Sequence, residues 1–100
     1  MIDLSISNRY YEIKMPKGEV IHIKRPNQEL LVRMMKLKDI STDDWETVFG
    51  STLDLIIEVF NRNTEGNIYQ KSDIEDYVSF KTAMAIIQDY LEFALEEIKK

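Results

Sequence analysis

The sequence has no cysteine among its 100 residues, and it has only three glycines, two prolines, one histidine and one tryptophan. The absence of cysteine excludes disulfide bonds and thiol chemistry. With His22 as the one histidine, a zinc site or a histidine-based catalytic triad has too few parts. The glycines are scattered, and none belongs to a loop that could cradle phosphate. An enzyme is therefore the least favoured class of protein.

Long apolar runs are also missing. No stretch is long and apolar enough to span a bilayer, and the first ten residues lack the basic and then apolar order of a secretory signal. The sequence thus predicts a cytosolic protein. A hydrophobic content of 44% over 100 residues suits a single domain, residues 1–100, with one core.

Acidic and basic residues are unevenly distributed along the chain. Residues 1–40 hold 8 Lys and Arg against 5 Asp and Glu, whereas residues 41–100 hold 5 against 13, and the net charge is −5. An acidic half repels nucleic acid, and the basic residues between Lys24 and Lys38 are too few to form a basic stripe. Nucleic-acid binding is therefore disfavoured.

Two short segments near the N-terminus alternate apolar and polar residues, which is the pattern of strands with one buried face. They cover residues 2–6 and residues 10–15. Asn8-Arg9 between them can form a tight turn, because Asn tolerates positive φ. The pattern predicts two neighbouring strands.

A further strand is predicted at Val20–Lys24, with Ile21 and Ile23 facing inward. Pro16-Lys17-Gly18 precedes it, where Pro presets φ and Gly permits a left-handed exit from the turn. Residues 1–25 are thus predicted to form a small antiparallel β-meander or hairpin. Such a sheet cannot bury its apolar face alone, so helices must cover it.

Helix-start signals follow this sheet. Asn27 is the predicted N-cap of a helix that ends near Leu37. Ser41 with Asp44 resembles a capping box at the start of a second helix.

Two more helices are predicted closer to the C-terminus. Ser72 with Glu75 resembles another capping box, which opens a short helix through about Tyr77. Ser79 is a candidate cap for the long final helix, although the two helices could also run on with a kink. Strands followed by three to four helices define an α+β fold, in which the β-meander or hairpin packs on the helical part, residues 27–100.

The second helix is predicted to bury one face, because its apolar residues recur at helical spacing. Trp45, Phe49, Ile56 and Phe60 are the predicted core side chains. Gly50 lies inside this pattern at a cost of about 1 kcal/mol relative to Ala. A glycine kept at this cost predicts that another element packs closely against the helix at Gly50.

The final helix carries two apolar sets on different sides, although one packed face needs only one of them. Ile86, Tyr90 and Phe93 form the second set, which we name the terminal-helix stripe. The stripe is either buried against the strands or exposed as a partner-binding surface. In the second case its aromatic side chains would act as anchors for a partner helix.

Carboxylates cluster at residues 43–44, 73–76 and 96–97. The first two clusters fall in first helical turns, where acidic side chains favour the exposed amides, and the third lies at the end of the printed sequence. Capping and solvation are therefore favoured over acid–base chemistry. His22 lies on a strand and is expected to point to solvent.

The segment from Asn61 to Ser72 is similar to a calcium-binding loop. Oxygen-bearing side chains stand at its first, third and fifth positions, with Gly66 at the sixth. The first position is Asn rather than Asp, and the twelfth is Ser72 rather than a bidentate Glu. With Glu65 as its one carboxylate, the loop is expected to bind no calcium, since affinity follows ligand charge.

The order of these elements resembles that of a known family. The opening strand pair reads ISNRYYEIKMP, and after a short helix the long second helix reads DWETVFGSTLDLIIEVFN. A polar loop follows, then the short acidic helix SDIEDYV and the terminal helix AMAIIQDYLEFAL. In this order, and in its aromatic and aliphatic pattern, the whole chain resembles the tail assembly chaperones of long-tailed bacteriophages and prophages.

The resemblance implies a non-enzymatic protein, without a cofactor or metal, in the cytoplasm of a bacterial host. Chaperones of this family coat the aggregation-prone tape measure protein, recruit tail tube subunits and leave before the virion is complete. This chain would correspond to the shorter of two products, made without a frameshift. Tape measure and tail tube proteins would be its partners, and formation of a homo-oligomer stays open.

The residues themselves leave a second class of function open, a small acidic regulatory or adaptor protein that binds one folded partner. An acidic surface and surplus apolar stripes would suit either function. A tape measure gene directly downstream would favour the chaperone.

Overall fold

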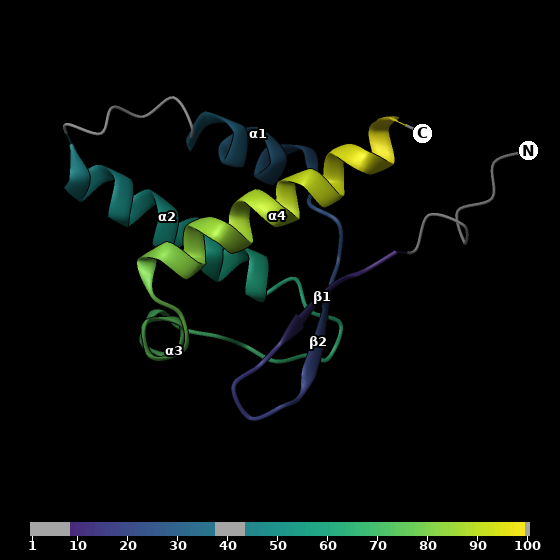
Figure 1. The fold of residues 1–100 in the computed structure, drawn as a ribbon, viewed down its shortest axis with the longest axis horizontal. Helices are drawn as coiled ribbons and strands as arrows, with labels where there is room; N and C mark the ends of the chain where they lie inside the picture. The colour runs from purple at the N-terminus through teal and green to yellow at the C-terminus, as the bar shows by residue number, and fades with distance from the viewer. Residues whose placement is uncertain (1–8, 38–43, 100) are drawn as a thin grey trace, which may run out of the picture.

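A two-stranded antiparallel hairpin is followed by four helices, so the fold is α+β as predicted (Figure 1). The computed structural model describes residues 9–37 and 44–99, apart from the side chains of residue 45 and of residues 97–99. The strand predicted at residues 2–6 lies outside the described residues. Hairpin and helices share one apolar core.

The hairpin joins β1 (Tyr11–Lys14) to β2 (Val20–Ile23) as antiparallel strands, with Ile13 opposite Ile21. Ile21 and Ile23 are buried, as their alternation predicts. Gly18 has φ +98° in the turn, a conformation that glycine adopts without the steric cost of a Cβ. The predicted hairpin turn is confirmed.

The outer edge of β2 is covered by residues 62–64, from the loop that follows the second helix. The amide of Thr64 donates to the carbonyl of His22 at 2.9 Å, and the amide of Lys24 donates to the carbonyl of Arg62 at 3.0 Å. These residues therefore take the place of a further strand at this edge. Nothing in the sequence pattern predicted this pairing.

The helices are α1 (Gln28–Leu37), α2 (Trp45–Phe60), α3 (Lys71–Tyr77) and α4 (Phe80–Lys99). α2 packs against each of the other three, and α4 also contacts α1. Figure 1 shows α4 crossing α2, with the N-terminal end of α2 projecting beyond the crossing. This arrangement covers the C-terminal part of α2 more fully than its start.

Two predicted helix caps are confirmed. Asn27 Oδ1 accepts the amide of Leu30 at 2.8 Å, and Ser79 Oγ accepts the amide of Thr82 at 3.2 Å. Each bond satisfies one of the amides that an α-helix leaves without a partner in its first turn. Because α3 and α4 are separate helices, Ser79 marks a true helix start.

Two other predicted caps need correction. Asp44 is itself the N-cap of α2, and Ser41, its predicted partner, lies outside the described residues. The capping box predicted for Ser72 is wrong, because α3 begins two residues earlier than that box requires. Its N-cap is Gln70, whose amide donates to Asp73 Oδ2 at 2.9 Å. The acidic residue three positions after the cap is therefore Asp73.

The core predictions for α2 are confirmed at two of four positions. Ile56 is buried, and Phe60 is 1% exposed. The prediction is wrong for Phe49, which is 48% exposed because it lies on an open apolar surface where α2, α3 and α4 meet. The side chain of Trp45 lies outside the described residues. The close contact predicted at Gly50 is also wrong, since a Cβ built there would meet no heavy atom within 4 Å.

Candidate partner-binding surfaces

The terminal-helix stripe packs against β1 and is not an exposed surface. Tyr90 is 0% exposed, while Ile86 and Phe93 are half-buried against the core. The ring of Tyr11 on β1 lies 5.4 Å from that of Tyr90 and 5.8 Å from that of Phe93, centroid to centroid. The prediction of an exposed binding stripe is therefore wrong for Tyr90, because the hairpin covers this side of α4.

Polar contacts also close the seam between β1 and α4. The hydroxyl of Tyr90 donates to the carbonyl of Lys24, and the hydroxyl of Tyr11 donates to Asp89 Oδ2 at 2.6 Å. Burial raises the pKa of Tyr90 to about 12. Burial, together with Asp89, also raises the pKa of Tyr11 well above its usual range. Both phenols thus stay neutral donors, and the seam is held by hydrogen bonds as well as by apolar contact.

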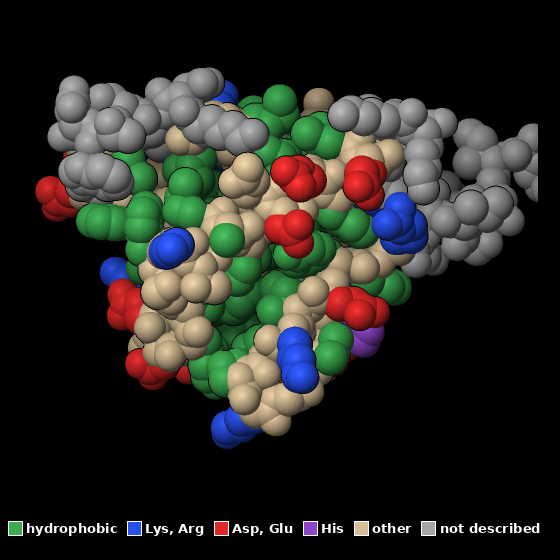
Figure 2. Space-filling view, in the orientation of Figure 1, with side chains coloured by type: hydrophobic (Ala, Val, Ile, Leu, Met, Phe, Trp, Pro, Cys, Tyr) green, Lys and Arg blue, Asp and Glu red, His purple; other side chains and the backbone are tan. Residues whose placement is uncertain are grey.

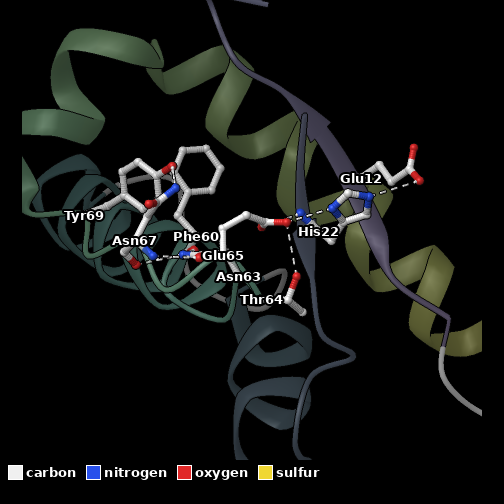
Figure 3. Close-up of polar contacts among 8 residues, drawn as sticks. All are labelled: Glu12, His22, Phe60, Asn63, Thr64, Glu65, Asn67 and Tyr69. Carbon is white, nitrogen blue, oxygen red and sulfur yellow. Dashed lines mark hydrogen bonds and ion pairs between the residues drawn. The ribbon is translucent and has the colours of Figure 1, made fainter. Parts of the chain in front are cut away.

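A buried asparagine organises the loop between α2 and α3 (Figure 3). The side chain of Asn63 is 7% exposed, and its Nδ2 donates to the carbonyls of Phe60 and Asn67, each at 2.8 Å. Its Oδ1 accepts the amide of Asn67 at 3.0 Å. The sequence predicted a polar loop without a core role, and only the recurrence of Asn at 61, 63 and 67 signals these bonds.

His22 and Glu65 fasten the same loop to β2 (Figure 3). Glu65 Oε1 accepts the amide of His22 at 3.0 Å, and Oε2 lies 2.8 Å from Nδ1 of the His22 ring. These bonds, with a smaller contribution from Thr64, lower the pKa of Glu65 to about 2. Nε2 of His22 lies 3.7 Å from Glu12. The half-exposed His22 thus stands between two carboxylates instead of pointing freely to solvent.

The oxygens that would form a calcium site already accept hydrogen bonds within the chain. Asn61 Oδ1 accepts the amide of Tyr69 at 2.7 Å, while Asn63 and Glu65 accept the bonds just described. Within the described ranges, no group of three or more His, Cys, Asp or Glu side chains could hold a metal ion. The absence of a calcium response stays a prediction.

An apolar hollow of about 160 Å³ opens where α2, the end of α3 and the start of α4 meet. We name it the α2–α3–α4 hollow. Phe49 and Phe80 stand edge to face on its wall, with ring centroids 4.4 Å apart. The residues that line it are Phe49, Thr52, Leu53, Ile74, Glu75, Val78, Ser79, Phe80 and Ala83. Figure 2 shows apolar side chains gathered over the N-terminal half of α2.

A second hollow, of about 130 Å³, lies between α1 and α4. Met34, Leu37 and Leu91 on its wall are buried core residues. These side chains already serve the fold, whereas Phe49 exposes half of its surface. The α2–α3–α4 hollow is therefore the stronger candidate for binding a partner.

In the part of the chain that the structure describes, every helix is too short or too polar to cross a membrane. Comparison with protein-family models, with curated protein sequences and with solved structures finds no match. What the chain does is therefore inferred from its own residues and surfaces.

Proposed function

We propose that the protein is a tail assembly chaperone of a long-tailed bacteriophage or prophage. In this function it binds the tape measure protein, assists assembly of the tail tube and is absent from the mature virion. The order of elements supports the proposal, because a hairpin, a short helix, a long helix, a short acidic helix and a terminal helix follow one another. It acts by binding, not by catalysis, in the bacterial cytoplasm.

The α2–α3–α4 hollow is the observation that carries this proposal. A chaperone for a helical, aggregation-prone protein must offer apolar surface to the apolar face of a helix. Phe49 offers such surface, since it is 48% exposed on the wall of the hollow. An engineered cavity of about 150 Å³ in another protein accepts benzene, so a hollow of this size suits one large apolar side chain.

The charge of the chain supports a helix with basic residues as the partner. Residues 41–100, which build the whole hollow, hold 13 acidic and 5 basic residues. Complementary charge speeds the encounter with a basic segment and suppresses acidic competitors. It also keeps an exposed apolar surface soluble before the partner arrives.

Co-expression tests the proposal. The probe is the tape-measure-like protein encoded directly downstream, produced alone and together with this chain, and the measurement is its soluble fraction. We expect wild type to keep the probe soluble and Phe49→Ser to lose this effect. Met35→Ser is the matched control, because Met35 is 49% exposed but lies on α1. It should keep the probe soluble.

Two results would overturn the proposed function. One is the absence of a tape-measure-like gene beside the gene for this chain. The other is a probe that stays insoluble with wild type although the chain itself is folded and abundant. A pull-down in which the chain captures one folded regulatory protein would instead support the adaptor.

A further inference from the structure

Gly50 occupies an exposed position inside α2, where glycine is unfavourable. Glycine in a helix costs about 1 kcal/mol relative to alanine, because its backbone is less restricted in the unfolded chain. Such a glycine is usually kept where a neighbour approaches the backbone closely. Nothing among the described residues does so, since a Cβ at Gly50 would meet no heavy atom within 4 Å. The residues that the structure describes therefore give no reason for this glycine.

The position of Gly50 relates it to the α2–α3–α4 hollow. Glu46, Gly50 and Leu53 follow one another at the i, i+4, i+7 spacing and therefore form one stripe along α2. Leu53 also lines the hollow, and Phe49 stands beside the stripe. A helix laid along this stripe could approach the α2 backbone at Gly50, because the distance between packed helices depends on the side chains at the contact.

Charged side chains around this region are mostly acidic. Glu75 lines the hollow, and Glu46 lies one helical turn before Gly50. Lys81, exposed in the first turn of α4, is the basic neighbour from that helix. Among the described residues, the two acidic groups Glu46 and Glu75 outnumber the one basic neighbour, so they favour a partner that carries Lys or Arg beside its apolar face.

We propose that the stripe of Glu46, Gly50 and Leu53, together with the α2–α3–α4 hollow, is the docking site for one amphipathic helix of the tape-measure-like partner. The partner helix crosses α2 at Gly50 and places one aromatic or branched aliphatic side chain in the hollow beside Phe49. Its Lys or Arg residues face Glu46 and Glu75. This inference rests on the proposed function and names the surface that performs it.

The test compares two substitutions at the same position. Gly50→Ala adds one methyl group where the partner helix approaches, so it should raise the thermal midpoint of the free protein but weaken binding by at least about threefold. Gly50→Leu should also fold, because Leu favours helix more than Gly does and open space surrounds the position. It should weaken binding by at least about tenfold, or 1.4 kcal/mol, since its side chain blocks the close approach.

Overlapping synthetic peptides that cover the downstream tape-measure-like protein serve as probes, and calorimetry measures their affinity. The tightest-binding peptide is then tested against each variant and against Glu46→Lys/Glu75→Lys, which should bind it at least about tenfold more weakly. Gly50→Gln is the substitute if Gly50→Leu does not fold. Circular dichroism and the thermal midpoint establish folding in every case.

The outcomes separate this inference from the proposed function. If wild type binds no peptide and fails to solubilise the whole partner, the proposed function is overturned and this docking site with it. If wild type binds but the bulky Gly50 variant binds equally well, the site is wrong while the proposed function stands. Undiminished binding by the double lysine variant would overturn the charge selection.

Discussion

Two aromatic side chains, each within an apolar stripe on a helix, end up in opposite environments. Tyr90 of α4 is 0% exposed beneath β1, whereas Phe49 of α2 is 48% exposed on the wall of the α2–α3–α4 hollow. Helical spacing alone left Tyr90 open to burial or binding, and it predicted Phe49 as a core residue. The element that crosses above each residue decides the outcome, because a helix stripe is buried only where a neighbour covers it.

The two regions also differ in their polar contacts. At the closed seam, Tyr11 and Tyr90 donate hydrogen bonds that a displaced hairpin would break. Around the hollow, apolar contacts predominate, with the hydroxyl of Thr52 donating to the sulfur of Met84 at 3.5 Å. Apolar contact is non-directional and can be shared with a partner, whereas a buried hydrogen bond must be remade elsewhere. The closed seam suits stability, and the hollow suits binding.

The largest expected effect compares Phe60 with Phe49 inside one helix. Phe60→Ala should lower the free energy of unfolding by about 3–5 kcal/mol, because it leaves a cavity in the core. Phe49→Ala should lower it by less than about 1.5 kcal/mol, since half of the ring already contacts water. Urea denaturation measures both. Equal losses would show that the hollow is as well packed as the core.

Asn63→Ala should cause the next largest loss of stability. The substitution removes three hydrogen bonds and leaves the carbonyls of Phe60 and Asn67 without this partner. The free energy of unfolding should fall by about 1–3 kcal/mol, which is the cost of a buried polar group without a partner. The same denaturation experiment applies, with exposed Asn67→Ala as the control. A loss no larger in Asn63→Ala than in that control would contradict the buried role.

The low pKa of Glu65 predicts that the stability of the fold depends on pH. Its pKa is about 2 in the fold against an ordinary value of 4.5, chiefly because its carboxylate accepts the amide of His22. The charged form therefore stabilises the fold, fully above pH 4.5 and progressively less as the pH falls toward 2. Thermal midpoints of wild type and Glu65→Gln should differ at pH 7 and converge near pH 2. A difference that stays constant over this range would show that the bonds between Glu65 and His22 do not stabilise the fold.

Gly50→Ala should raise the free energy of unfolding by about 0.5–1 kcal/mol, because alanine loses less backbone entropy in a helix. The open space around Gly50 means that the added methyl group meets no obstacle. Urea denaturation measures the gain. A loss of stability would reveal a close neighbour at Gly50 and would remove the reason to place a partner helix there.

No effect is expected from calcium. Oxygens of Asn61, Asn63 and Glu65 are engaged in hydrogen bonds, and Ser72 stands where a calcium loop needs a bidentate Glu. The thermal midpoint should stay the same after addition of calcium chloride. Calorimetry that detects binding tighter than about 10⁻⁴ M would prove this wrong.

Local patterns predicted the local structure well. The hairpin turn at Gly18 and the caps at Asn27 and Ser79 depend on residues within three or four positions of each other. The error at α3 was small, because the capping box lies two residues earlier than predicted, at Gln70–Asp73. Acidic and polar residues crowd that stretch, so several of them fit the same capping pattern.

The candidate binding site was predicted less well. Helical spacing showed that α4 carries more apolar surface than one face needs, but it could not show that β1 would cover Tyr90. Nor could it show that α2, α3 and α4 leave an open hollow at Phe49. The sequence pattern also could not predict the pairing of Asn63 with Ile23, because the two residues are 40 positions apart.

By itself, then, the sequence determined the hairpin, the order of the helices and two of their caps, because turn chemistry and hydrophobic periodicity act over a few residues. The tertiary structure alone decided which apolar stripe is closed and which is open. That choice depends on how α4 crosses α2 and how the hairpin packs on α4, and both follow from the packing of the whole core.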